Sequence, residues 1–596
     1  MTTAFDTALT TYLTYLFGAP LNTATSQATA EVPRKWHVAI DGVGFMLAEF
    51  PKWKTLATLR AQQDSREAGE LSLNPEGLWR RSASSWDHGA GQTRYDDAEA
   101  SDRRRFRSSK GVNPWTPGQV TLLNDTEQVR SVAGSIPQIG IAGNLYWADG
   151  SDIYKSDLST NTAITMPATV SSLCSVGSYI LAACGASGIR KIAASASTEA
   201  SWVTGTVDVV GFAKGRVLAA AGAALYNPTT ALTGGPAALP AALYTQPDST
   251  FTWVGFAEGT SWIYAAGNVG DKGLIYKTAV KADGTALDTP TVAGRCEDGE
   301  TITSIYGYLG TLLIGTSLGI RIGVPNSSGD LELGAAIPVG TVYTMLGRLN
   351  YVYFGWSNYD GTSTGLGRID LAALTDTQRV VPAYATDLMV TGQGTVRGIG
   401  FYSNRLIIGV AGLGVYKQSD NLVQSGTIDS GLIGFGITED KTLVGGLSNY
   451  TGSGTVTLQC STEGATFDGL AESGEQLRGQ YHELRVTLTR GSTTAGPTLT
   501  LATLYGFPCP QGTMMITLAC EIDEASETKT TTESTNPVER LGGLRDLWLT
   551  RRIAAVQLGD WTFQGIVEAL EFDAQRETRA RRGWVGTATV ALKVLP

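Results

Sequence analysis

The chain has 596 residues, of which 42% are hydrophobic and 17% charged, with 72 glycines and a formal net charge of −10. A chain of this length holds several domains, and its many glycines suit an all-β protein with tight turns. The modest negative charge argues against a nucleic-acid-binding protein, because phosphate contacts need clustered Lys and Arg. No apolar run is long enough to span a membrane, and Met1–Asp6 lacks the basic region of a secretory signal, so we expect folding in a cytoplasm.

The cysteines are scattered and form no Cys-x-x-Cys pair, so we expect buried thiols in a reducing compartment. Cys174 and Cys184 are predicted on neighbouring strands, and a disulfide between them is the alternative. His37, His88 and His482 are the only histidines, which leaves a zinc site poorly supplied. We therefore expect no metal site and no other cofactor.

Residues 1–30 are rich in Ala and Thr, with a helical hint around Leu9–Phe17. Two interpretations of this arm stay open: a mobile segment, or a segment that orders against a neighbouring subunit. Further on, apolar residues alternate on both sides of Asp41-Gly42, which predicts a β-hairpin.

Between Leu73 and Asp125 the sequence is rich in Arg and Trp. Basic residues interleaved with aromatic ones can bind single-stranded nucleic acid, but acidic residues in the same stretch weaken that interpretation. Arginines in charge pairs that fix an extended segment over a neighbouring surface fit better. The docking candidates of this segment are Arg80, Arg81, Arg103, Arg104, Arg105 and Arg107.

Three motifs of this segment occur in a fixed order: Gly77-Leu-Trp-Arg-Arg, Gly89-Ala-Gly-Gln and Arg105-Phe-Arg-Ser-Ser-Lys-Gly-Val-Asn-Pro-Trp-Thr. Together they resemble the N-terminal region of minor tail proteins from tailed phages that infect actinobacteria, where such motifs precede a repetitive β region. The resemblance implies a virion protein of the tail, assembled in the host cytoplasm, with other tail proteins as partners. Because tails have rotational symmetry, it also implies a homo-oligomer around the tail axis.

A unit of two short apolar strands, joined by a Gly-containing turn and often ending in an aromatic or basic residue, recurs between about residues 140 and 420. The copies begin near Gly143, Gly177, Gly215, Thr260, Gly310, Leu349 and Asn404. Their period of about 43 residues predicts a β-propeller of about seven blades over residues 114–425. An apolar strand precedes each copy, so we expect each blade to contain an inner strand, the two strands of the unit and a variable outer strand.

No blade supplies a recurring Asp or Glu at an equivalent inner position, so no carboxylate pair for glycoside hydrolysis can be nominated and we expect no enzyme. Asp149, Asp152 and Asp157 lie in one turn that could hold Ca²⁺, although turn-forming Asp is the commoner role. For contact with a host-surface glycan, the candidates are aromatic residues of the blade loops: Trp202, Trp253, Trp262, Trp356 and Tyr359.

After Gly426 the period is lost, but alternating strands continue, and residues 426–508 predict a β-sandwich of jelly-roll type. Sandwiches of this kind often bind carbohydrate, but a fold alone does not give a function. A packing module between the propeller and the C-terminal domain is the simpler interpretation.

Residues 509–596 predict a small α+β domain. Asn536-Pro537 marks a helix start. Its predicted apolar face consists of Val538, Leu541, Leu544, Leu547 and Trp548. A small sheet with one helix resembles the tail-type fold from which phages build rings. A basic loop near the end is either a solvated tip or an anchor, and it adds the docking candidates Arg576, Arg579, Arg581 and Arg582.

These features predict a mainly β protein: an N-terminal arm and docking segment (residues 1–113), the propeller, the sandwich and the tail-type domain. We expect a structural component of a phage tail tip that docks through its flanks and presents the propeller and sandwich for tail assembly and host-surface attachment. Two alternatives stay open: a propeller glycosidase or depolymerase of cell-surface glycan, and a nozzle protein of a short-tailed phage.

Overall fold

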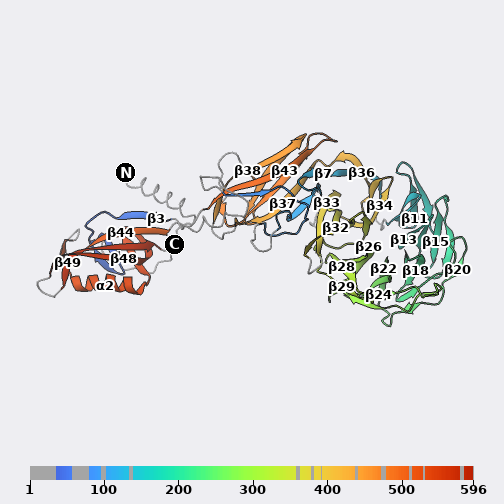
Figure 1. Ribbon diagram of the computed structural model, residues 1–596, viewed down its shortest axis with the longest axis horizontal. Helices are drawn as coiled ribbons and strands as arrows, with labels where there is room; N and C mark the ends of the chain where they lie inside the picture. The colour runs from blue at the N-terminus through green and yellow to red at the C-terminus, as the bar shows by residue number, and fades with distance from the viewer. Residues whose placement is uncertain are drawn as a thin grey trace. The chain divides into compact units, whose positions relative to one another are not determined.

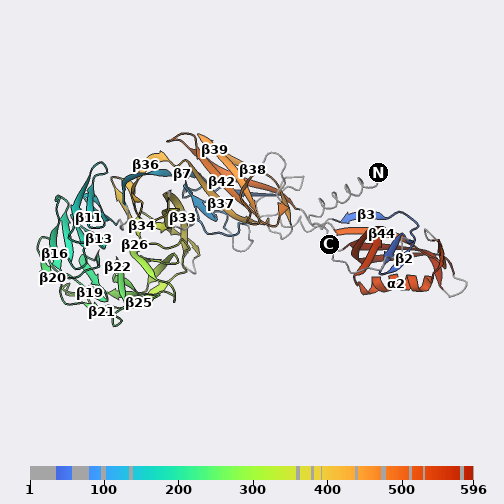
Figure 2. The ribbon, with the colours of Figure 1, turned by 180° about the vertical axis from the view of Figure 1, so that it is seen from behind.

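The structure is a computed structural model that describes residues 35–56, 79–95, 102–132, 138–357, 363–376, 381–390, 392–435, 440–470, 478–508, 513–527, 531–577 and 583–594. Strands dominate the described residues, which form two compact units (Figures 1 and 2). The smaller unit lies within Met1–Trp79, Ile437–Thr442 and Phe507–Pro596, and the larger within Arg80–Gly436 and Leu443–Gly506. The helix expected around residues 9–17 falls outside the described residues.

The larger unit contains a series of sheets with four or five strands each (Figure 1). The first two sheets in chain order contain β9 (Ile139–Ala142), β10 (Asn144–Asp149), β11 (Asp152–Ser156) and β12 (Asn161–Thr165), and then β13 (Ser172–Val176), β14 (Tyr179–Ala183), β15 (Ile189–Ala193), β16 (Ala200–Thr204) and β20 (Ala237–Ala238). The next three contain β17 (Val209–Ala213), β18 (Arg216–Ala221), β19 (Ala224–Tyr226) and β21 (Tyr244–Thr245); β22 (Thr252–Glu258), β23 (Ile263–Val269), β24 (Lys272–Thr278) and β25 (Thr291–Arg295); and β26 (Ile302–Tyr308), β27 (Thr311–Thr316), β28 (Ile320–Pro325) and β29 (Leu331–Leu333). The last two contain β30 (Met345–Arg348), β31 (Tyr351–Ser357), β32 (Thr364–Asp376) and β33 (Val381–Val390), and then β34 (Thr395–Tyr402), β35 (Arg405–Ala411) and β36 (Gly414–Leu422) with β8 (Asn124–Ser131).

Each sheet starts with an apolar strand, continues with the two strands of the repeat unit and ends in a more variable strand, as the repeat predicts. The first strands contact one another in series from β9 through β13, β17, β22, β26 and β30 to β34, and β34 contacts β9. This arrangement is that of a β-propeller.

The last sheet takes its outer strand from a point before the first sheet. β8 pairs antiparallel with β36, which places Glu127 opposite Lys417. Gly414 permits this approach, because a Cβ at that position would lie 2.2 Å from the carbonyl oxygen of Arg130. The repeat pattern did not predict that β8 pairs with the last sheet, because β8 is a polar strand with little apolar alternation.

Basic residues at the ends of the repeat units bind the next sheet along the chain. Lys155 Nζ donates to the carbonyl oxygen of Ala194 at 2.7 Å, and Lys191 Nζ donates to that of Leu232 at 2.8 Å. Lys277 makes the same kind of bond to the following sheet at 2.6 Å. These ammonium groups satisfy loop carbonyls and connect neighbouring sheets.

Two further sheets form a β-sandwich. One contains β40 (Asp468–Gly469), β39 (Gly454–Thr462), β42 (His482–Arg490), β37 (Ser425–Ile433) and β5 (Ser108–Lys110). The other contains β41 (Arg478–Gly479), β38 (Lys441–Gly452), β43 (Pro497–Pro508), β7 (Val120–Leu122) and β6 (Val112–Asn113), and β4 (Trp79–Ala83) also pairs with β43.

The sheets combine segments of the chain differently from the domain boundaries that the sequence predicted. Strands β4 to β7, which the sequence placed in the docking segment and at the start of the propeller, complete the two sandwich sheets. Strands of two to five residues between Gly, Pro and Arg show too little alternation to be assigned to a sheet from sequence.

The smaller unit is one seven-stranded sheet with a helix against it. The strand order is β2 (Val43–Phe45), β1 (Val38–Ile40), β47 (Ala554–Leu558), β48 (Trp561–Glu577), β49 (Trp584–Val594), β44 (Thr513–Ile522) and β3 (Lys52–Leu56). The first and last strands that the structure describes, β1 and β49, therefore share a sheet. The predicted hairpin is present, with Asp41 and Gly42 in the left-handed conformation that its turn requires. A second hairpin joins β45 (Ala525–Glu527) to β46 (Thr532–Ser534).

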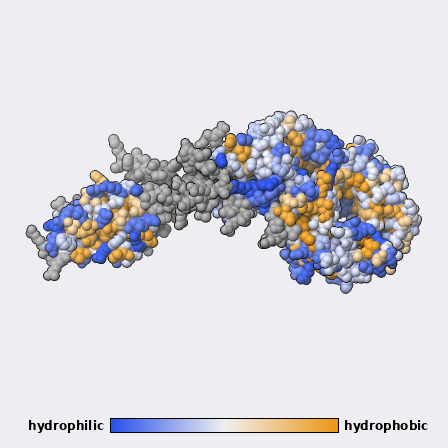
Figure 3. Space-filling model, in the orientation of Figure 1, coloured by the Kyte–Doolittle hydropathy of each residue, from blue (hydrophilic) through white to orange (hydrophobic). Residues whose placement is uncertain are grey.

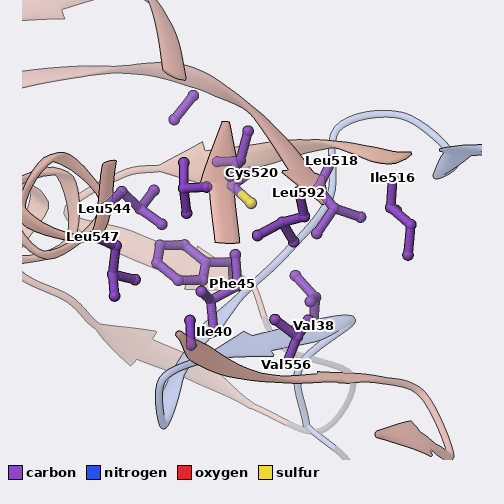
Figure 4. Close-up of a cluster of buried hydrophobic side chains, with 14 of the residues drawn as sticks. Val38, Ile40, Phe45, Ile516, Leu518, Cys520, Leu544, Leu547, Val556 and Leu592 are labelled. Atoms are coloured by element: carbon purple, nitrogen blue, oxygen red, sulfur yellow. The ribbon is translucent and has the colours of Figure 1, made fainter. Parts of the chain in front are cut away.

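Helix α2 (Pro537–Thr550) covers part of this sheet and contacts β44, β48 and β49. Leu544 and Leu547 enter the core next to Phe45, in a cluster that also contains Leu518 (Figure 4). Val538 is 47% exposed, so the apolar face predicted for the helix is partly wrong. Pro537 and Arg540 are buried on that side instead.

Helix α2 ends at a residue in the left-handed conformation. Arg551 adopts φ 53° at the C-cap and donates its backbone N–H to the carbonyl of Leu547. In the part of the chain that the structure describes, no helix has the length and apolarity needed to cross a membrane.

Candidate functional site

The segment that carries the tail-like motifs lies between the propeller and the sandwich. We call residues 79–123 the strap; the structure describes residues 79–95 and 102–123 of it. Its strand β5 pairs with β37 of one sandwich sheet, and β7 pairs with β43 of the other. The strap also contacts β33 of the propeller.

Glycines of the strap allow close approach to β33. The backbone N–H of Ala90 donates to the carbonyl of Tyr384 at 2.6 Å. A Cβ on Gly89 would lie 2.7 Å from the backbone nitrogen of Tyr384, and one on Gly91 would lie 2.8 Å from its hydroxyl. The Gly-Ala-Gly-Gln motif is therefore a packing requirement of this contact.

A buried ion pair forms the centre of the contact. The indole N–H of Trp115 donates to both carboxylate oxygens of Asp387, at 3.0 and 3.2 Å, and Arg368 Nε donates to the same carboxylate. Arg368 also binds Asn113 Oδ1 at 3.0 Å. Burial opposes the charge of Arg368, yet the Asp387 carboxylate raises the pKa of its guanidinium. The charged pair thus holds Trp115 and Asn113 of the strap against the propeller.

A second group of charges holds the strap to the sandwich. Arg107 forms an ion pair with Glu483 at 2.5 Å, and the Glu483 side chain is 4% exposed. Burial raises the pKa of the Glu483 carboxyl, and the charge of Arg107 opposes that shift. Arg485 binds Asp429 with two hydrogen bonds at 2.7 and 2.9 Å, and Ser108 donates to the same carboxylate at 3.0 Å.

Other arginines of the strap stabilise its own course. Arg104 Nε donates to Asp87 Oδ1 at 3.0 Å, and Arg105 donates to the carbonyl of Ala90 at 2.8 Å. Burial lowers the pKa of Arg105. Arg81 is buried. The Arg104–Asp87 pair agrees with the interpretation of charge-paired arginines that fix an extended segment, whereas Arg105 binds a backbone carbonyl.

The remaining docking candidates divide between exposed residues and residues outside the description. Arg80 and Arg103 are exposed. Arg576 forms an ion pair with Asp523 at 3.0 Å. Arg579, Arg581 and Arg582 lie outside the described residues.

The proposed carbohydrate contacts are placed unfavourably for that role. Trp202 and Trp356 are 0% exposed and Trp253 is 5% exposed, because their indoles fill the cores of the sheets. Trp262 is half-buried beneath Lys277, whose Nζ lies 5.1 Å from the ring centroid. Tyr359 lies outside the described residues. None of the three buried tryptophans presents a ring to a sugar.

Exposed apolar residues occur instead at two turn tips of the propeller. Leu309 is 65% exposed and Leu349 is 76% exposed, and both adopt positive φ, at 48° and 60°. The hydroxyl of Tyr308 donates to the carbonyl of Leu349 at 2.8 Å, which places the two turns side by side. Beside them, Arg348 lies 4.3 Å above the ring of Phe401. Left-handed leucines in water are unusual, and we call Leu309, Leu349 and Arg348 the turn-tip surface. Hydrophobic and hydrophilic residues share the visible face of the propeller in Figure 3.

The aspartate turn has a local structural role. Asp157 accepts the backbone N–H groups of Ser159 and Thr160 at 2.9 and 2.7 Å, and these bonds hold its pKa below the ordinary value. Across the described residues, no cluster of His, Cys, Asp and Glu has the arrangement of a metal site. Cys174 and Cys184 are free thiols, and burial raises the pKa of Cys174 to about 12.

Sequence reasoning missed the acidic partners of the strap. Asp387 and Asp429 each stand in a strand that is otherwise apolar or small, and Glu483 is the second residue of β42. A lone carboxylate in a buried strand is a signal that an arginine must approach it. The sequence shows the signal but does not identify the arginine.

Comparison with known proteins assigns neither a family nor a function to the chain. No protein-family model matches the chain, and no curated protein matches it. Among solved structures, it is similar to the computationally designed Ika8 protein, with a TM-score of 0.34, 10% identity, and coverage of 52% of this chain and 96% of that one. It is also similar to the WD40 β-propeller domain of Doa1, with a TM-score of 0.34, 10% identity, and coverage of 49% and 97%.

Proposed function

We propose that this protein is a structural component of a phage tail tip. The observation that carries the proposal is the strap, because the motifs that resemble minor tail proteins are the residues that join the propeller to the sandwich. Gly89 and Gly91 pack on Tyr384, and Trp115 binds Asp387. The motifs therefore build a rigid two-domain platform, which suits a protein whose role is to hold and present surfaces.

In this proposal the platform is a seven-bladed propeller fixed to a jelly-roll sandwich. The series of sheets supplies the blades, and β8 closes the ring on β36. The turn-tip surface is the part of the propeller best suited to attachment, since Leu309 and Leu349 are exposed and Arg348 offers a charge. The smaller unit docks into the tail, with several copies around its axis.

Labelling of virions tests the assignment. Antibodies against the chain are expected to decorate the end of the tail in electron micrographs. Decoration of a ring at the end of a short tail would support the nozzle alternative, and intact virions without label would refute both tail assignments.

Adsorption tests the attachment role. Phage that carries Leu309→Ser and Leu349→Ser is expected to assemble normally but to adsorb to host cells more slowly than wild type. The control is Leu318→Ser, another exposed leucine of the propeller (55% exposed). Equal adsorption by all three phages would exclude the turn-tip surface from attachment.

The enzymatic alternative has a direct test. Purified protein incubated with host envelope polysaccharide is expected to release no new reducing ends. Release that depends on this chain would replace the structural proposal with a depolymerase.

A further inference from the structure

The turn-tip surface places two leucines where neither the backbone conformation nor solvation favours them. Leu309 and Leu349 are 65% and 76% exposed, and both adopt positive φ. The same turn in two other sheets of the propeller carries Gly177 and Asn404, residue types that adopt this conformation readily. Folding of the chain does not account for leucine at these two positions, which points to coverage by another molecule.

Bonds between neighbouring turns hold the leucines in place. The hydroxyl of Tyr308 donates to the carbonyl oxygen of Leu349 at 2.8 Å. Arg348 donates from Nη2 to Asn404 Oδ1 of the next turn at 3.1 Å, with its guanidinium above the ring of Phe401. Because these contacts fix the turns before any partner arrives, covering the leucines costs little conformational entropy.

The charge directly beside the leucines is positive. Arg348 is exposed, and its partners, an amide oxygen and a phenyl ring, are neutral and leave its charge uncompensated. A second cation, Lys214, lies on another turn of the series, where its Nζ donates to the carbonyl oxygen of Thr260 at 2.7 Å. The Glu258 carboxylate accepts the backbone N–H of Lys214 at 2.9 Å and offsets that charge, but not the charge of Arg348. Apolar tips beside a cation complement a surface that is apolar beneath a layer of negative charge.

We propose that the turn-tip surface binds an anionic lipid bilayer, with Leu309 and Leu349 among the acyl chains and Arg348 at the lipid phosphates. Side chains on turn tips enter a fluid layer without the matching shape that a folded partner would need. This inference rests on the attachment role proposed above and names the class of surface to which the protein attaches.

The size of the contact predicts reversible binding. Transfer of one leucine from water into an apolar layer strengthens binding by roughly 10- to 150-fold. One arginine near an anionic surface adds about fivefold. A single copy is therefore expected to bind vesicles reversibly, and several copies on one tail would bind together much more tightly.

Co-sedimentation of the full-length chain with lipid vesicles tests the contact. The wild type is expected to sediment with vesicles of phosphatidylglycerol and phosphatidylcholine, and less with phosphatidylcholine alone. Leu309→Ser/Leu349→Ser is expected to weaken binding to the anionic vesicles at least about tenfold. The matched control is Leu318→Ser, which changes a leucine that is 55% exposed beyond the other end of strand β27 and is expected to bind like the wild type.

A change of charge separates the two parts of the contact. Arg348→Gln is expected to lower binding to the anionic vesicles about fivefold and to leave binding to phosphatidylcholine unchanged. Equal thermal unfolding midpoints of all variants would show that the fold is intact. Wild-type protein that binds neither kind of vesicle would overturn the proposal, as would a Leu309→Ser/Leu349→Ser variant that binds as well as Leu318→Ser. Retention on host polysaccharide without vesicle binding would assign the surface to a glycan and would also overturn it.

The result is separable from the assignment to the tail. Labelled tail tips on virions, together with a chain that binds no vesicles, would reject only the lipid contact. Vesicle binding by a chain that is absent from virions would reject only the tail assignment.

Discussion

The indole N–H of Trp115 lies 3.0 Å from a carboxylate oxygen of Asp387, and this bond joins the strap to strand β33 of the propeller. Trp115→Phe removes the donor and keeps most of the ring. We expect a loss of about 1.5–3 kcal/mol in the free energy of unfolding, because a hydrogen bond to a buried charged group is lost. Urea unfolding measures the loss, and an unchanged m-value would show that the same surface still unfolds together.

Removal of the acid itself is expected to cost more. Asp387→Ala leaves Arg368 buried without its counter-ion, for which we expect a loss of about 3–5 kcal/mol. The double variant Asp387→Leu/Arg368→Met is expected to be more stable than Asp387→Ala, since no buried charge is left unpaired. The exposed pair Lys272–Asp298 provides the control, and its disruption is expected to have little effect. A loss for Asp387→Ala no larger than that of the control would contradict the assignment of a buried pair.

Closure of the last sheet by β8 can be tested at one glycine. A Cβ at Gly414 would lie 2.2 Å from the carbonyl of Arg130, whereas a Cβ at Gly412 meets no atom within 4 Å. Gly412→Ala is expected to cost about 1 kcal/mol from its positive φ alone. Gly414→Ala adds the displacement of β8, so we expect a clearly larger loss of thermal stability. Equal losses for the two variants would argue against pairing of β8 with β36.

Removal of a lysine that binds loop carbonyls of a neighbouring sheet is expected to make that loop more mobile. Lys191→Met keeps the aliphatic stem but removes the ammonium group that binds the carbonyls of Leu232 and Gly234. We expect a loss of about 1.5–3 kcal/mol, the usual range for hydrogen bonds to a charged group. Hydrogen exchange in the loop around Leu232 should rise. The exposed Lys272→Met is the control, and a loop that exchanges equally in both variants would refute this role for Lys191.

Acidic pH is expected to loosen the start of the strap. Partial burial opposes ionisation of Asp87, but the hydrogen bond from Arg104 lowers its pKa below the ordinary 3.8. Because the native pKa is depressed, the stabilisation is fully present above 3.8 and is lost as the pH falls through the native value. The stability difference between wild type and Asp87→Asn should therefore shrink in that range.

Unfolding midpoints measured across this pH range provide the comparison. Glu332→Gln removes an exposed carboxylate and serves as the control. A difference between wild type and Asp87→Asn that stays constant at all pH values would show that the Arg104 contact does not stabilise the ionised form.

Elements with a strong local pattern could be predicted from the sequence. The repeat of short apolar strands predicted the sheets from β9 to β36, and Asn536-Pro537 predicted the start of α2. Pairings between distant segments could not be predicted: β8 precedes the first sheet in the chain, yet it completes the last one. A polar edge strand carries no mark of the sheet that it joins.

The candidate site shows the same limit. The arginines and Trp115 of the strap stand out in composition, and charge pairs were predicted for the arginines. Their partners Asp387 and Glu483 were not, because hundreds of residues separate the two sides of each pair. For the tryptophans, residue type suggested sugar contact, but Trp202 and Trp356 lie in the core because a large apolar ring gains more from burial.

The pairing of β3 with β44 has a consequence for synthesis of the chain. Lys52 lies opposite Thr517, so β3 leaves the ribosome long before its partner strand β44 and must wait for it. At usual elongation rates the wait is roughly 20–90 s. During that time β3 has an open edge that a neighbouring nascent chain on the same messenger RNA can pair with. Correct assembly of the smaller unit is therefore expected to depend on chaperones and on the spacing of ribosomes along the message.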